Sequence, residues 1–391
     1  MKQICALLLT AALLTGPAAA AGETAEAAGE TAEAAQPALD LSAASAVLME
    51  KETGTLLYEK ESHEKLEPAS VTKVMTLLLI FEALDSGRIA KEDVVTVSAY
   101  AAGMGGSQVY LKEGEQMTVG ELVKCITVVS GNDAAVAMAE YLAGSETAFV
   151  EQMNRRAQEL GMGDTTFLNC TGLPAQGHVT SAYDIALMSR ELVLNHPSVR
   201  EYTTIWMDSI RNGAFGLTNT NRLVRFYQGA TGLKTGSTDS ALYCMSATAE
   251  RDGMELIAVV MKSPTSADRF EGAKALLDYG FASYTLVSVY PDSPLAPIPV
   301  LLGEQGQVQP QLARECRLLV RKGQEGQIST KVTLAQDLAA PVEQGQTVGE
   351  MEVSLDGQVR DTVPILSAQG VERLTIPKIF SRLLEEMLMA G

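Results

Sequence analysis

The stretch EPASVTKVMTLLLIF, residues 67–81, places a lysine at the start of an otherwise apolar segment. An almost unbroken apolar run, Val74 to Phe81, follows Lys73 and contains no turn residues. The run has helical length, so it predicts a helix that is largely buried in its domain. A lysine in the first turn of such a helix either extends its amine to the surface or is kept there for chemistry.

Ser70 lies three residues before Lys73, so on a helix the two side chains share a face. A serine hydroxyl is a poor nucleophile until a base removes its proton, and no histidine is near it in the sequence. Lys73 can be that base only when it is neutral, and a free lysine has a pKa of about 10.4. Burial, the positive end of the helix and a nearby second cation would lower this pKa toward the ~7–8 that suits catalysis. Alone, the pattern S-x-x-K is weak, because it often occurs by chance.

A second candidate place is Ser130-Gly131-Asn132, inside TVGELVKCITVVSGNDAAVAMAEYLAG, residues 118–144. The segment predicts two apolar helices that are interrupted at these three residues. A serine and an asparagine at a helix break can simply be capping residues. In a catalytic site, Ser130 would instead relay a proton and Asn132 would hydrogen-bond a substrate amide.

A third candidate place is Lys234-Thr235-Gly236, in a β-like run. Taken alone, it can be an edge-strand lysine followed by a turn glycine. In a site, Gly236 would let a substrate backbone lie against the strand, because glycine has no side chain. Lys234 and Thr235 would offer a cation and a hydroxyl to a carboxylate.

The bulk composition is that of an ordinary globular protein. The 391 residues can hold two domains, and 46% of them are hydrophobic and 20% charged. The net charge of −18 argues against nucleic acid as a partner.

Residues 1–21 combine a lysine, an apolar run too short to span a bilayer and a small-residue end, which predicts a secretory signal peptide. Residues 22–40 have almost no large apolar side chains and predict a flexible spacer.

Cysteine and histidine spacing does not suggest a metal site. Cys5 would leave with the signal peptide, and the remaining cysteines are far apart, so we expect buried free thiols. These cysteines are Cys125, Cys170, Cys244 and Cys316. The three histidines do not pair at ligand spacing, and we expect neither a metal nor a cofactor.

The order of elements predicts an α+β domain over residues 41–285. Residues 45–60 are typical of a β-hairpin, a mostly helical region extends to about residue 200, and strands begin at residue 230. An amphipathic helix at roughly 267–282 closes the unit. Strands at both ends with helices between them imply one sheet built from both termini of the domain.

The remainder of the chain predicts a small all-β domain, residues 288–375, because short alternating segments are separated by Gly and Gln turns. Residues 377–391 predict an amphipathic helix. Its charges balance, with Lys378 and Arg382 against Glu385 and Glu386, whereas membrane-surface anchors are usually more basic. We interpret it as a membrane-surface helix, with packing on the β-rich domain or on another subunit as the alternative.

The three candidate places form a set when they are taken together. S-x-x-K opening an apolar helix, S-x-N at a helix break and K-T-G on a strand occur in the order found in penicillin-binding proteins and class A β-lactamases. The sequence resembles the low-molecular-mass penicillin-binding proteins that act as serine-type D-alanyl-D-alanine carboxypeptidases. The resemblance runs from about residue 40 to the C-terminus and includes EPASVTKVMT, SGNDAAVAMAE, FLNCTGLP, HVTSAYDIALMSREL and GLKTGSTDSALYCMSATAERDGMELIAVVM.

The resemblance implies a penicillin-binding/serine β-lactamase-like fold, an antiparallel sheet flanked by helices, followed by a β-rich domain and often an amphipathic helix on the membrane. It also implies the catalytic roles. Ser70 would be the acylated nucleophile, Lys73 its general base, and Ser130 the donor of a proton to the leaving D-alanine. The backbone N–H groups of Ser70 and Ser237 would form the oxyanion hole.

By the same resemblance, Asn132 would hold the peptide, and Lys234 and Thr235 would bind its terminal carboxylate beside Gly236. The implied partners are the peptidoglycan stem peptide and β-lactam inhibitors. The implied location is outside the cytoplasm, at the outer face of the cytoplasmic membrane or in the cell wall.

Two positions depart from the family pattern. Ser237 follows K-T-G where relatives often have His, Phe or Tyr. Some relatives also carry an arginine near the place of Asn219-Thr220-Asn221 that grips the carboxylate, and here Thr220 is in that neighbourhood. Arg222 or Arg225 could replace it.

Three other functions remain open from the sequence. A class A-like β-lactamase needs a water-activating glutamate, and ELVLN, Glu191 to Asn195, has the right pattern but continues a periodic helix. A peptidoglycan D,D-endopeptidase would use the same motifs. A non-catalytic cell-wall-binding protein could keep the fold.

Overall fold

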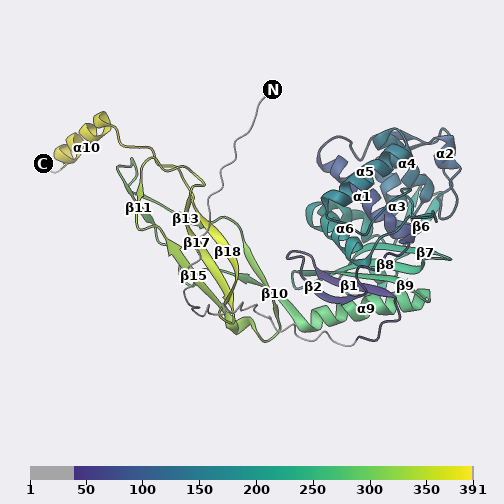
Figure 1. Cartoon of the computed structure of the whole chain (residues 1–391). Coiled ribbons are helices and arrows are strands. Elements are labelled where there is room, and N and C mark those ends of the chain that lie inside the picture. Colours follow the sequence, from purple (N-terminus) through teal and green to yellow (C-terminus); the bar gives the residue numbers. More distant parts are fainter. Residues whose placement is uncertain (1–38, 390–391) are drawn as a thin grey trace, which may run out of the picture. The chain divides into compact units, whose positions relative to one another are not determined.

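The computed structural model describes residues 39–389 (Figure 1). The predicted signal peptide, residues 1–21, and the predicted spacer as far as residue 38 lie outside the described residues. In the described part, every helix is too short or too polar to cross a bilayer. The four cysteines of this part are free and buried, which confirms the prediction of buried thiols.

A five-stranded antiparallel sheet in the order β2-β1-β9-β8-β7 organises the first part of the chain. Its strands are β1 (Ser45–Glu50), β2 (Leu56–Lys60), β7 (Ala230–Thr238), β8 (Leu242–Arg251) and β9 (Met254–Ser263). The N-terminal hairpin pairs with β9, so the sheet is built from both ends of the domain, as predicted. β7 is an edge strand, which leaves its outer backbone groups open to an extended ligand.

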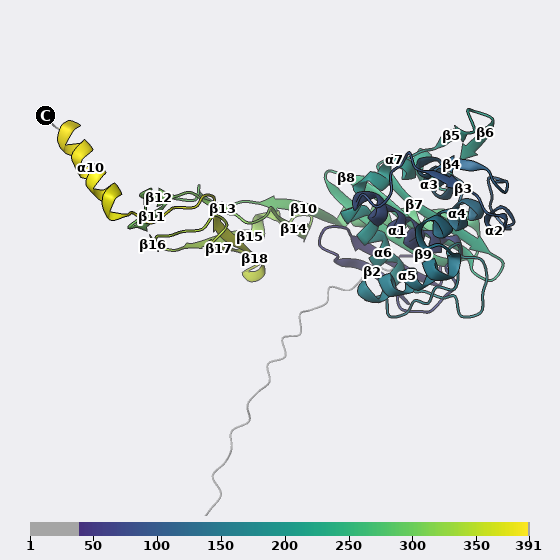
Figure 2. The same cartoon turned by 90° about the horizontal axis from the view of Figure 1, so that it is seen from above.

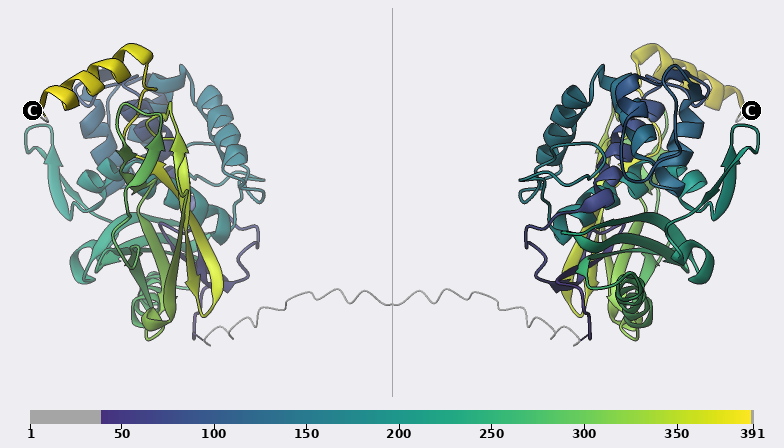
Figure 3. Two further views of the ribbon diagram at one scale, coloured as in Figure 1. Left: turned by 90° about the vertical axis from the view of Figure 1, so that its left-hand side faces the viewer. Right: turned by 90° about the vertical axis from the view of Figure 1, so that its right-hand side faces the viewer.

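Helices cover both faces of the sheet (Figure 1, Figure 3). α9 (Ser266–Ser283) packs on one face, where its apolar side chains join those of β1, β8 and β9 in one core. The other face carries a helical layer of α1 (Lys73–Asp85), α3 (Val119–Val128), α4 (Asn132–Ala143), α5 (Glu146–Glu159) and α6 (Ala182–Asn195). α1 is buried along almost its whole length, which confirms the prediction of a buried helix.

Short elements connect the helices and the sheet. They are η1 (Ala69–Thr72), η2 (Pro197–Val199), α2 (Ala99–Ala102), α7 (Arg200–Thr203), α8 (Leu223–Phe226), β3 (Val94–Thr96), β4 (Gln116–Thr118), β5 (Met207–Ile210) and β6 (Phe215–Thr218). The β3–β4 and β5–β6 ribbons lie side by side (Figure 2), joined by Arg211 Nε and Glu115 Oε1 at 2.7 Å. β3 and β4 lie inside the region predicted to be mostly helical, and they were not predicted because three-residue strands show too little alternation to be recognised.

The second part of the chain consists of strands around its own apolar core. A four-stranded sheet has the order β13-β18-β17-β15, and two further small sheets are β10-β14 and β12-β11-β16. The strands are β10 (Tyr284–Val289), β11 (Ile298–Leu301), β12 (Gln307–Val308), β13 (Pro310–Leu312), β14 (Cys316–Arg321), β15 (Ile328–Leu334), β16 (Leu338–Ala339), β17 (Thr347–Leu355) and β18 (Gln358–Ser367), with η3 (Glu325–Gln327) between β14 and β15. The predicted α+β fold followed by an all-β domain is confirmed. The chain continues into α10 (Ile376–Met389).

Candidate active site

Ser70 lies on a tightly constrained turn at the N-terminal end of α1. It is part of η1, a 3₁₀ helix that continues directly into α1 at Lys73, so the prediction that Ser70 opens a helix is confirmed. The Lys73 N–H bonds to the Ser70 carbonyl, which tightens this turn to 3₁₀ geometry. Ala69 has a positive φ of 48°, and a Cβ on Gly172 would lie 1.8 Å from the Ala69 carbonyl oxygen. Only glycine can be accommodated at position 172.

Lys73 is fully buried beside Ser70, as the S-x-x-K spacing predicted. Its Nζ donates to Ser70 Oγ at 3.1 Å, to Asn132 Oδ1 at 2.6 Å and to the Thr171 carbonyl at 2.7 Å. Burial lowers the pKa of Lys73 to about 7, although the charges of Cys170 and Asp133 act in the opposite direction.

The same contacts suit the neutral amine. A neutral amine has two hydrogens and one lone pair. Asn132 Oδ1 and the Thr171 carbonyl can each accept one hydrogen, since neither oxygen can donate. The lone pair is then directed at Ser70 Oγ, which is the geometry a general base requires.

Ser130 lies between α3 and α4, at the predicted helix break. Its backbone has a positive φ of 65°, an uncommon conformation for serine. Its side chain is buried, and its Oγ has no hydrogen-bond partner among the described residues. A buried hydroxyl without a partner is costly in a folded protein. A group of the substrate would satisfy it.

Asn132 is the first residue of α4, and its amide joins three segments. Its Nδ2 donates to the Gly105 carbonyl at 2.7 Å, while its Oδ1 accepts from Lys73. Its backbone N–H donates to the Ser107 carbonyl at 2.7 Å. Asn132 therefore positions the base and the loop beside it, a role in addition to the predicted binding of the peptide.

The K-T-G residues lie on the edge strand β7, facing Ser70. Lys234 is buried, and burial together with the charges of Lys73 and Arg269 holds the pKa of its amine well below the usual range. Lys234 thus lies near Lys73, although burial rather than a second cation accounts for the lowered pKa of Lys73. A Cβ on Gly236 would lie 2.8 Å from the backbone nitrogen of Ser70. Ser237, the next residue along β7, is exposed.

Arg269 of α9 supports β7 from behind, and sequence analysis did not identify it. Its Nη1 donates to the Gly236 carbonyl at 3.1 Å and to the Cys244 carbonyl at 3.4 Å. Burial lowers the pKa of this guanidinium to about 10, and in the described part of the chain it makes no ion pair. The feature of the sequence that could have identified Arg269 is its position in α9, where it lies in line with the buried apolar residues of the helix.

His178 also acts on the nucleophile turn and was likewise missed. Its Nδ1 accepts from the Leu168 N–H at 3.0 Å, so its Nε2 carries the proton and donates to Thr72 Oγ1 at 2.8 Å. Thr72 Oγ1 in turn donates to the Ala69 carbonyl at 2.8 Å. Burial lowers the pKa of His178 to about 4, so the ring is neutral at neutral pH.

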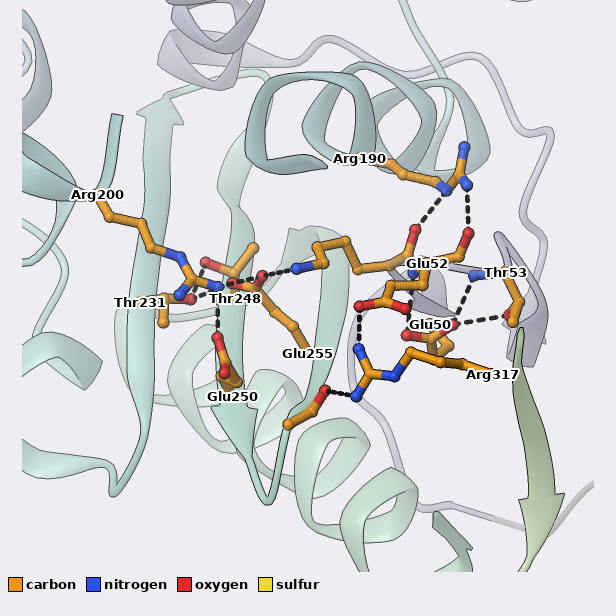
Figure 4. A network of polar contacts seen from close by, with 12 residues as sticks. Glu50, Glu52, Thr53, Arg190, Arg200, Thr231, Thr248, Glu250, Glu255 and Arg317 are labelled. Atoms are coloured by element: carbon orange, nitrogen blue, oxygen red, sulfur yellow. Dashed lines mark hydrogen bonds and ion pairs between the residues drawn. The ribbon is translucent and has the colours of Figure 1, made fainter. Parts of the chain in front are cut away.

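A polar network fixes the start of β7 (Figure 4). The side chain of Glu255 on β9 is fully buried and pairs with Lys51 Nζ at 3.1 Å and with Arg200 of α7. Its Oε1 accepts from Thr231 Oγ1 on β7 at 2.7 Å. Thr231 is three residues before Lys234, so the network holds the strand that carries the K-T-G residues.

Glu191 is remote from the nucleophile. It pairs with Arg156 at 2.6 Å, and Arg156 also pairs with Glu82 at 2.7 Å. Glu82 is nine residues after Lys73 on α1, about 14 Å along the helix axis. A water-activating role for Glu191 at Ser70, as a β-lactamase would need, has no support in this geometry.

The same region contains a group of potential metal ligands. Oxygen atoms of Glu82 and Glu191 and a nitrogen of His196 lie within 4.8 Å of one another. Arg156 already pairs with both carboxylates, and Asp85 pairs with His196 Nδ1. The cluster is therefore explained as a closed ion-pair network.

The structure shows the surroundings of Thr220, Arg222 and Arg225 near the predicted carboxylate site. Thr235 Oγ1 donates to Thr220 Oγ1 at 2.7 Å. The Arg225 guanidinium lies over the Trp206 and Phe226 rings, 5.8 and 5.5 Å from their centroids. Arg222 is exposed, and its charge acts on Arg269.

Comparison with known proteins agrees with the fold and the site. Residues 30–265 match the family described as D-alanyl-D-alanine carboxypeptidase, and residues 284–373 match the penicillin-binding protein 5 C-terminal domain. The carboxypeptidase DacF of Bacillus subtilis is 41% identical over 336 residues, 85% of this chain and 86% of that protein. Penicillin-binding protein 5 of Haemophilus influenzae has a TM-score of 0.73 at 28% identity, covering 87% of this chain and 100% of that one. The ampicillin-bound penicillin-binding protein D2 of Listeria monocytogenes has a TM-score of 0.58 at 34% identity, covering 63% and 100%.

These matches confirm the resemblance read from the three motifs, and they favour a peptidase over a β-lactamase or a non-catalytic wall-binding protein. The family match covers more than half of the chain, and the relative from Bacillus subtilis spans both the helical and the β-rich parts. The chain therefore belongs to the D-alanyl-D-alanine carboxypeptidase family of serine peptidases, with the C-terminal domain of penicillin-binding protein 5.

Proposed function

We propose that this D-alanyl-D-alanine carboxypeptidase removes the terminal D-alanine of peptidoglycan stem peptides through an acyl-enzyme on Ser70. The observation that carries the proposal is the Lys73 Nζ to Ser70 Oγ contact of 3.1 Å, with the pKa of the amine lowered to about 7. Near neutral pH about half of the lysine is then neutral. It can accept the proton of the serine without help from a histidine.

Acylation begins when Ser70 Oγ attacks the carbonyl carbon of the penultimate D-alanine and its proton passes to Lys73 Nζ. The negative charge that develops on the carbonyl oxygen is stabilised by the backbone N–H groups of Ser70 and Ser237. One such donor is worth about 3–4 kcal/mol. The contact of Gly236 with the Ser70 backbone supports this assignment, because it brings the two N–H groups into one neighbourhood.

Release of D-alanine requires a proton on the leaving nitrogen. The buried Ser130 hydroxyl, which has no partner among the described residues, can donate it and recover a proton from Lys73. The C–N bond then breaks and the acyl group stays on Ser70. In the second half of the reaction water attacks the ester, Lys73 takes the proton of the water, and Ser70 Oγ leaves protonated. The sum is peptide plus water giving the shortened peptide plus D-alanine.

Substrate recognition is assigned to β7 and to Asn132. The peptide would lie as an added strand along the outer edge of β7, and Gly236 would bring that edge close to the nucleophile, because its missing side chain makes room for the Ser70 backbone and not for the peptide. Lys234 and Thr235 would bind the terminal carboxylate. Burial lowers the pKa of Lys234 in the free enzyme, and the charge of the bound carboxylate would favour the ammonium form of its amine. Asn132 would hydrogen-bond the peptide while it holds Lys73.

The same attack on the amide of a β-lactam ring would leave an acyl group on Ser70, so β-lactams are proposed as inhibitors. The ampicillin-bound relative from Listeria monocytogenes supports this part of the proposal.

The test is D-alanine release from a stem-like peptide ending in D-Ala-D-Ala, measured for the wild type and for Ser70→Ala. We expect release by the wild type and its loss in the variant. Labelling with a fluorescent penicillin checks that the wild-type protein is folded and active. A labelled wild type that releases no D-alanine would contradict the carboxypeptidase proposal.

We also propose that the protein acts outside the cytoplasmic membrane, after removal of residues 1–21, with a catalytic domain at 41–285 and a β-rich domain at 288–375.

α10 is proposed to bind the membrane surface. Its exposed apolar side chains support this, and they are Ile376, Ile379, Phe380, Leu384, Met387 and Leu388. Lys378 pairs with Glu304, so one side of the helix also contacts the β-rich part. Deletion of residues 377–391 should abolish co-sedimentation with anionic lipid vesicles, and unchanged sedimentation would contradict the assignment.

A further inference from the structure

An exposed tyrosine lies on the loop that borders Asn132. The Gly105 carbonyl accepts from Asn132 Nδ2 and the Ser107 carbonyl accepts from the Asn132 backbone N–H, both at 2.7 Å. Tyr110 follows Ser107 by three residues, which is at most about 11 Å of chain. The Tyr110 side chain is 67% exposed, and its hydroxyl makes no hydrogen bond in the described part of the chain. Tyr110 therefore lies at the border of the active site with its ring in solvent.

The backbone of Tyr110 is strained, and its two neighbours hold it in place. Its φ is 56°, which is an outlier for a residue with a bulky side chain. Val109 and Leu111 are buried on either side, and the N–H of each donates to Asp133 Oδ2 at 3.0 Å. Asp133 is the second residue of α4, and its carboxylate is fully buried. The helix that begins at Asn132 thus fixes both sides of the exposed tyrosine.

Arg211, on the turn between β5 and β6, holds the same loop from a second element. Its Nη1 donates to the Val109 carbonyl at 2.9 Å, and its Nη2 donates to the Tyr110 carbonyl at 3.2 Å. The guanidinium lies over the Phe215 ring, 5.5 Å from its centroid. The Phe215 and Tyr110 rings meet edge to face at 6.3 Å, and we name these two rings the entrance pair. Backbone strain persists only where the surroundings over-determine it, and such positions cluster at functional sites.

Packing does not account for a tyrosine at position 110. Glycine and asparagine adopt a positive φ at lower cost than an aromatic residue does. A ring that is 67% exposed also contributes little buried apolar area in return. The exposed ring of Tyr110 is therefore available to a ligand.

The charges around the entrance pair favour an uncharged ligand. Arg211 is paired with Glu115, whose Oε1 accepts from the Arg211 Nε at 2.7 Å. The exposed neighbours Lys112 and Glu113 carry opposite charges, so neither sign prevails. Aromatic rings beside a free phenolic hydroxyl suit a ligand that presents both C–H groups and hydroxyl or amide groups.

The chemistry of peptidoglycan supplies such a ligand. A stem peptide is joined through its first residue to an N-acetylated disaccharide, and this amide consumes the carboxyl group of the sugar, so the disaccharide is uncharged. About four residues separate the sugar from the scissile carbonyl, which is roughly 13 Å in an extended chain. This span is comparable with the length of loop that separates Tyr110 from the contacts of Asn132.

We propose that the entrance pair binds the N-acetylated disaccharide that carries the stem peptide, with the Tyr110 ring against the C–H face of a sugar. The inference rests on the proposed function, because it requires that Ser70 acts on the stem peptide. Its consequence is that the enzyme prefers glycan-linked stem peptides to free ones.

The test compares a free pentapeptide that ends in D-Ala-D-Ala with the same pentapeptide attached to the disaccharide. The variant Tyr110→Gly removes the ring and also relieves the positive φ, so its melting temperature should stay within about 3 °C of the wild type. Tyr110→Phe keeps the ring and removes only the hydroxyl. The matched control is Tyr290→Gly, which removes a tyrosine that is 68% exposed in another part of the chain.

We expect the wild type to have a KM about tenfold lower for the disaccharide-linked pentapeptide than for the free one, with similar kcat values. In Tyr110→Gly, the KM for the linked substrate should rise to that of the free peptide, whereas the values for the free peptide should change less than about threefold. Tyr110→Phe should retain most of the preference, and Tyr290→Gly should behave as the wild type. Equal losses for both substrates would indicate a structural role, and a larger loss for the free peptide would indicate that the ring contacts the peptide. Either result would overturn the proposal.

Binding without turnover separates this inference from the proposed function. The probe is a short, peptide-free oligomer of N-acetylglucosamine, and its binding to Ser70→Ala is followed by saturation-transfer NMR. The sugar signals should appear with Ser70→Ala and be lost with Ser70→Ala/Tyr110→Gly; an unchanged signal in the double variant would overturn the proposal. If the wild type uses both pentapeptides equally well and the sugar does not bind, the inference fails alone. If the sugar binds but neither substrate releases D-alanine, the proposed function fails and the sugar site stands.

Discussion

Gly236 on β7 and Ser70 in η1 are in direct backbone contact. A Cβ on Gly236 would lie 2.8 Å from the Ser70 nitrogen and 2.9 Å from the Pro68 carbonyl oxygen. Two segments that are far apart in the sequence thus meet without a side chain between them. The contact brings the substrate-binding edge of β7 against the nucleophile, so the distance between them depends on a glycine.

Replacing Gly236 with alanine is therefore predicted to disable acylation. The new methyl group would push β7 away from Ser70, and the oxyanion donors would lose their geometry. A loss of about 10²–10³ in the rate of acylation is expected, the usual effect of losing one such donor. The measurement is the acylation rate with a fluorescent penicillin. Gly163→Ala is the matched control, since a Cβ there meets nothing within 4 Å. Similar rates for both variants would contradict the prediction.

The pKa of Lys73 predicts how acylation depends on pH. Because the neutral amine is the base and its pKa is about 7, the acylation rate should rise as pH increases through about 7 and then level off. Lys73→Arg should lose at least about 10² in rate, because a guanidinium does not deprotonate in this range. The rate should be followed with a fluorescent penicillin between pH 5.5 and 9. A rate that does not change over that range would exclude Lys73 as the titrating base.

Much of the site could be predicted because its motifs are local. Ser70 and Lys73 are three residues apart on an apolar helix, and Ser130 marks a break between two others, so each signal lies within one element. The sheet could be predicted for a similar reason, because β8 and β9 are rich in apolar residues and are joined by a clear turn.

His178 and Arg269 could not be predicted, because each contacts a residue that is far away in the sequence and no local pattern indicates such a contact. His178 meets Thr72 across 106 positions, and Arg269 reaches Gly236 across 33. An isolated histidine and an arginine on an amphipathic helix have no spacing that identifies a partner. Their roles depend on burial, which only the packed fold determines.

His178 predicts that the protein loses stability in mild acid. The pKa of the ring is about 4 in the folded chain and about 6.5 in the unfolded chain, so below pH 6.5 the unfolded chain binds a proton that the folded chain does not. The free energy of unfolding should fall between pH 6.5 and 4, by up to about 3 kcal/mol. Urea denaturation of the wild type and of His178→Gln at several pH values measures this, and the variant should lose most of that pH dependence.

The control for this experiment is Gln228→Ala, which changes an exposed side chain without a titratable group and should leave the pH dependence as in the wild type. If His178→Gln kept the full loss of stability between pH 6.5 and 4, another group would be responsible.

The last prediction concerns Glu255, whose fully buried carboxylate holds Lys51, Arg200 and Thr231 (Figure 4). Glu255→Gln leaves Lys51 without its carboxylate, whereas Arg200, which is 32% exposed, keeps its pair with Glu250. The cost should therefore lie below the roughly 3–5 kcal/mol of a fully buried pair, at about 1–3 kcal/mol. We expect a loss of that order in the free energy of unfolding, measured by urea denaturation. Because Thr231 begins the stretch of β7 that leads to Lys234, D-alanine release should fall as well. Glu352→Gln, which breaks the exposed pair with Lys331, should cost less than about 1 kcal/mol. Equal costs in the two variants would mean that the network is not a buried anchor of β7.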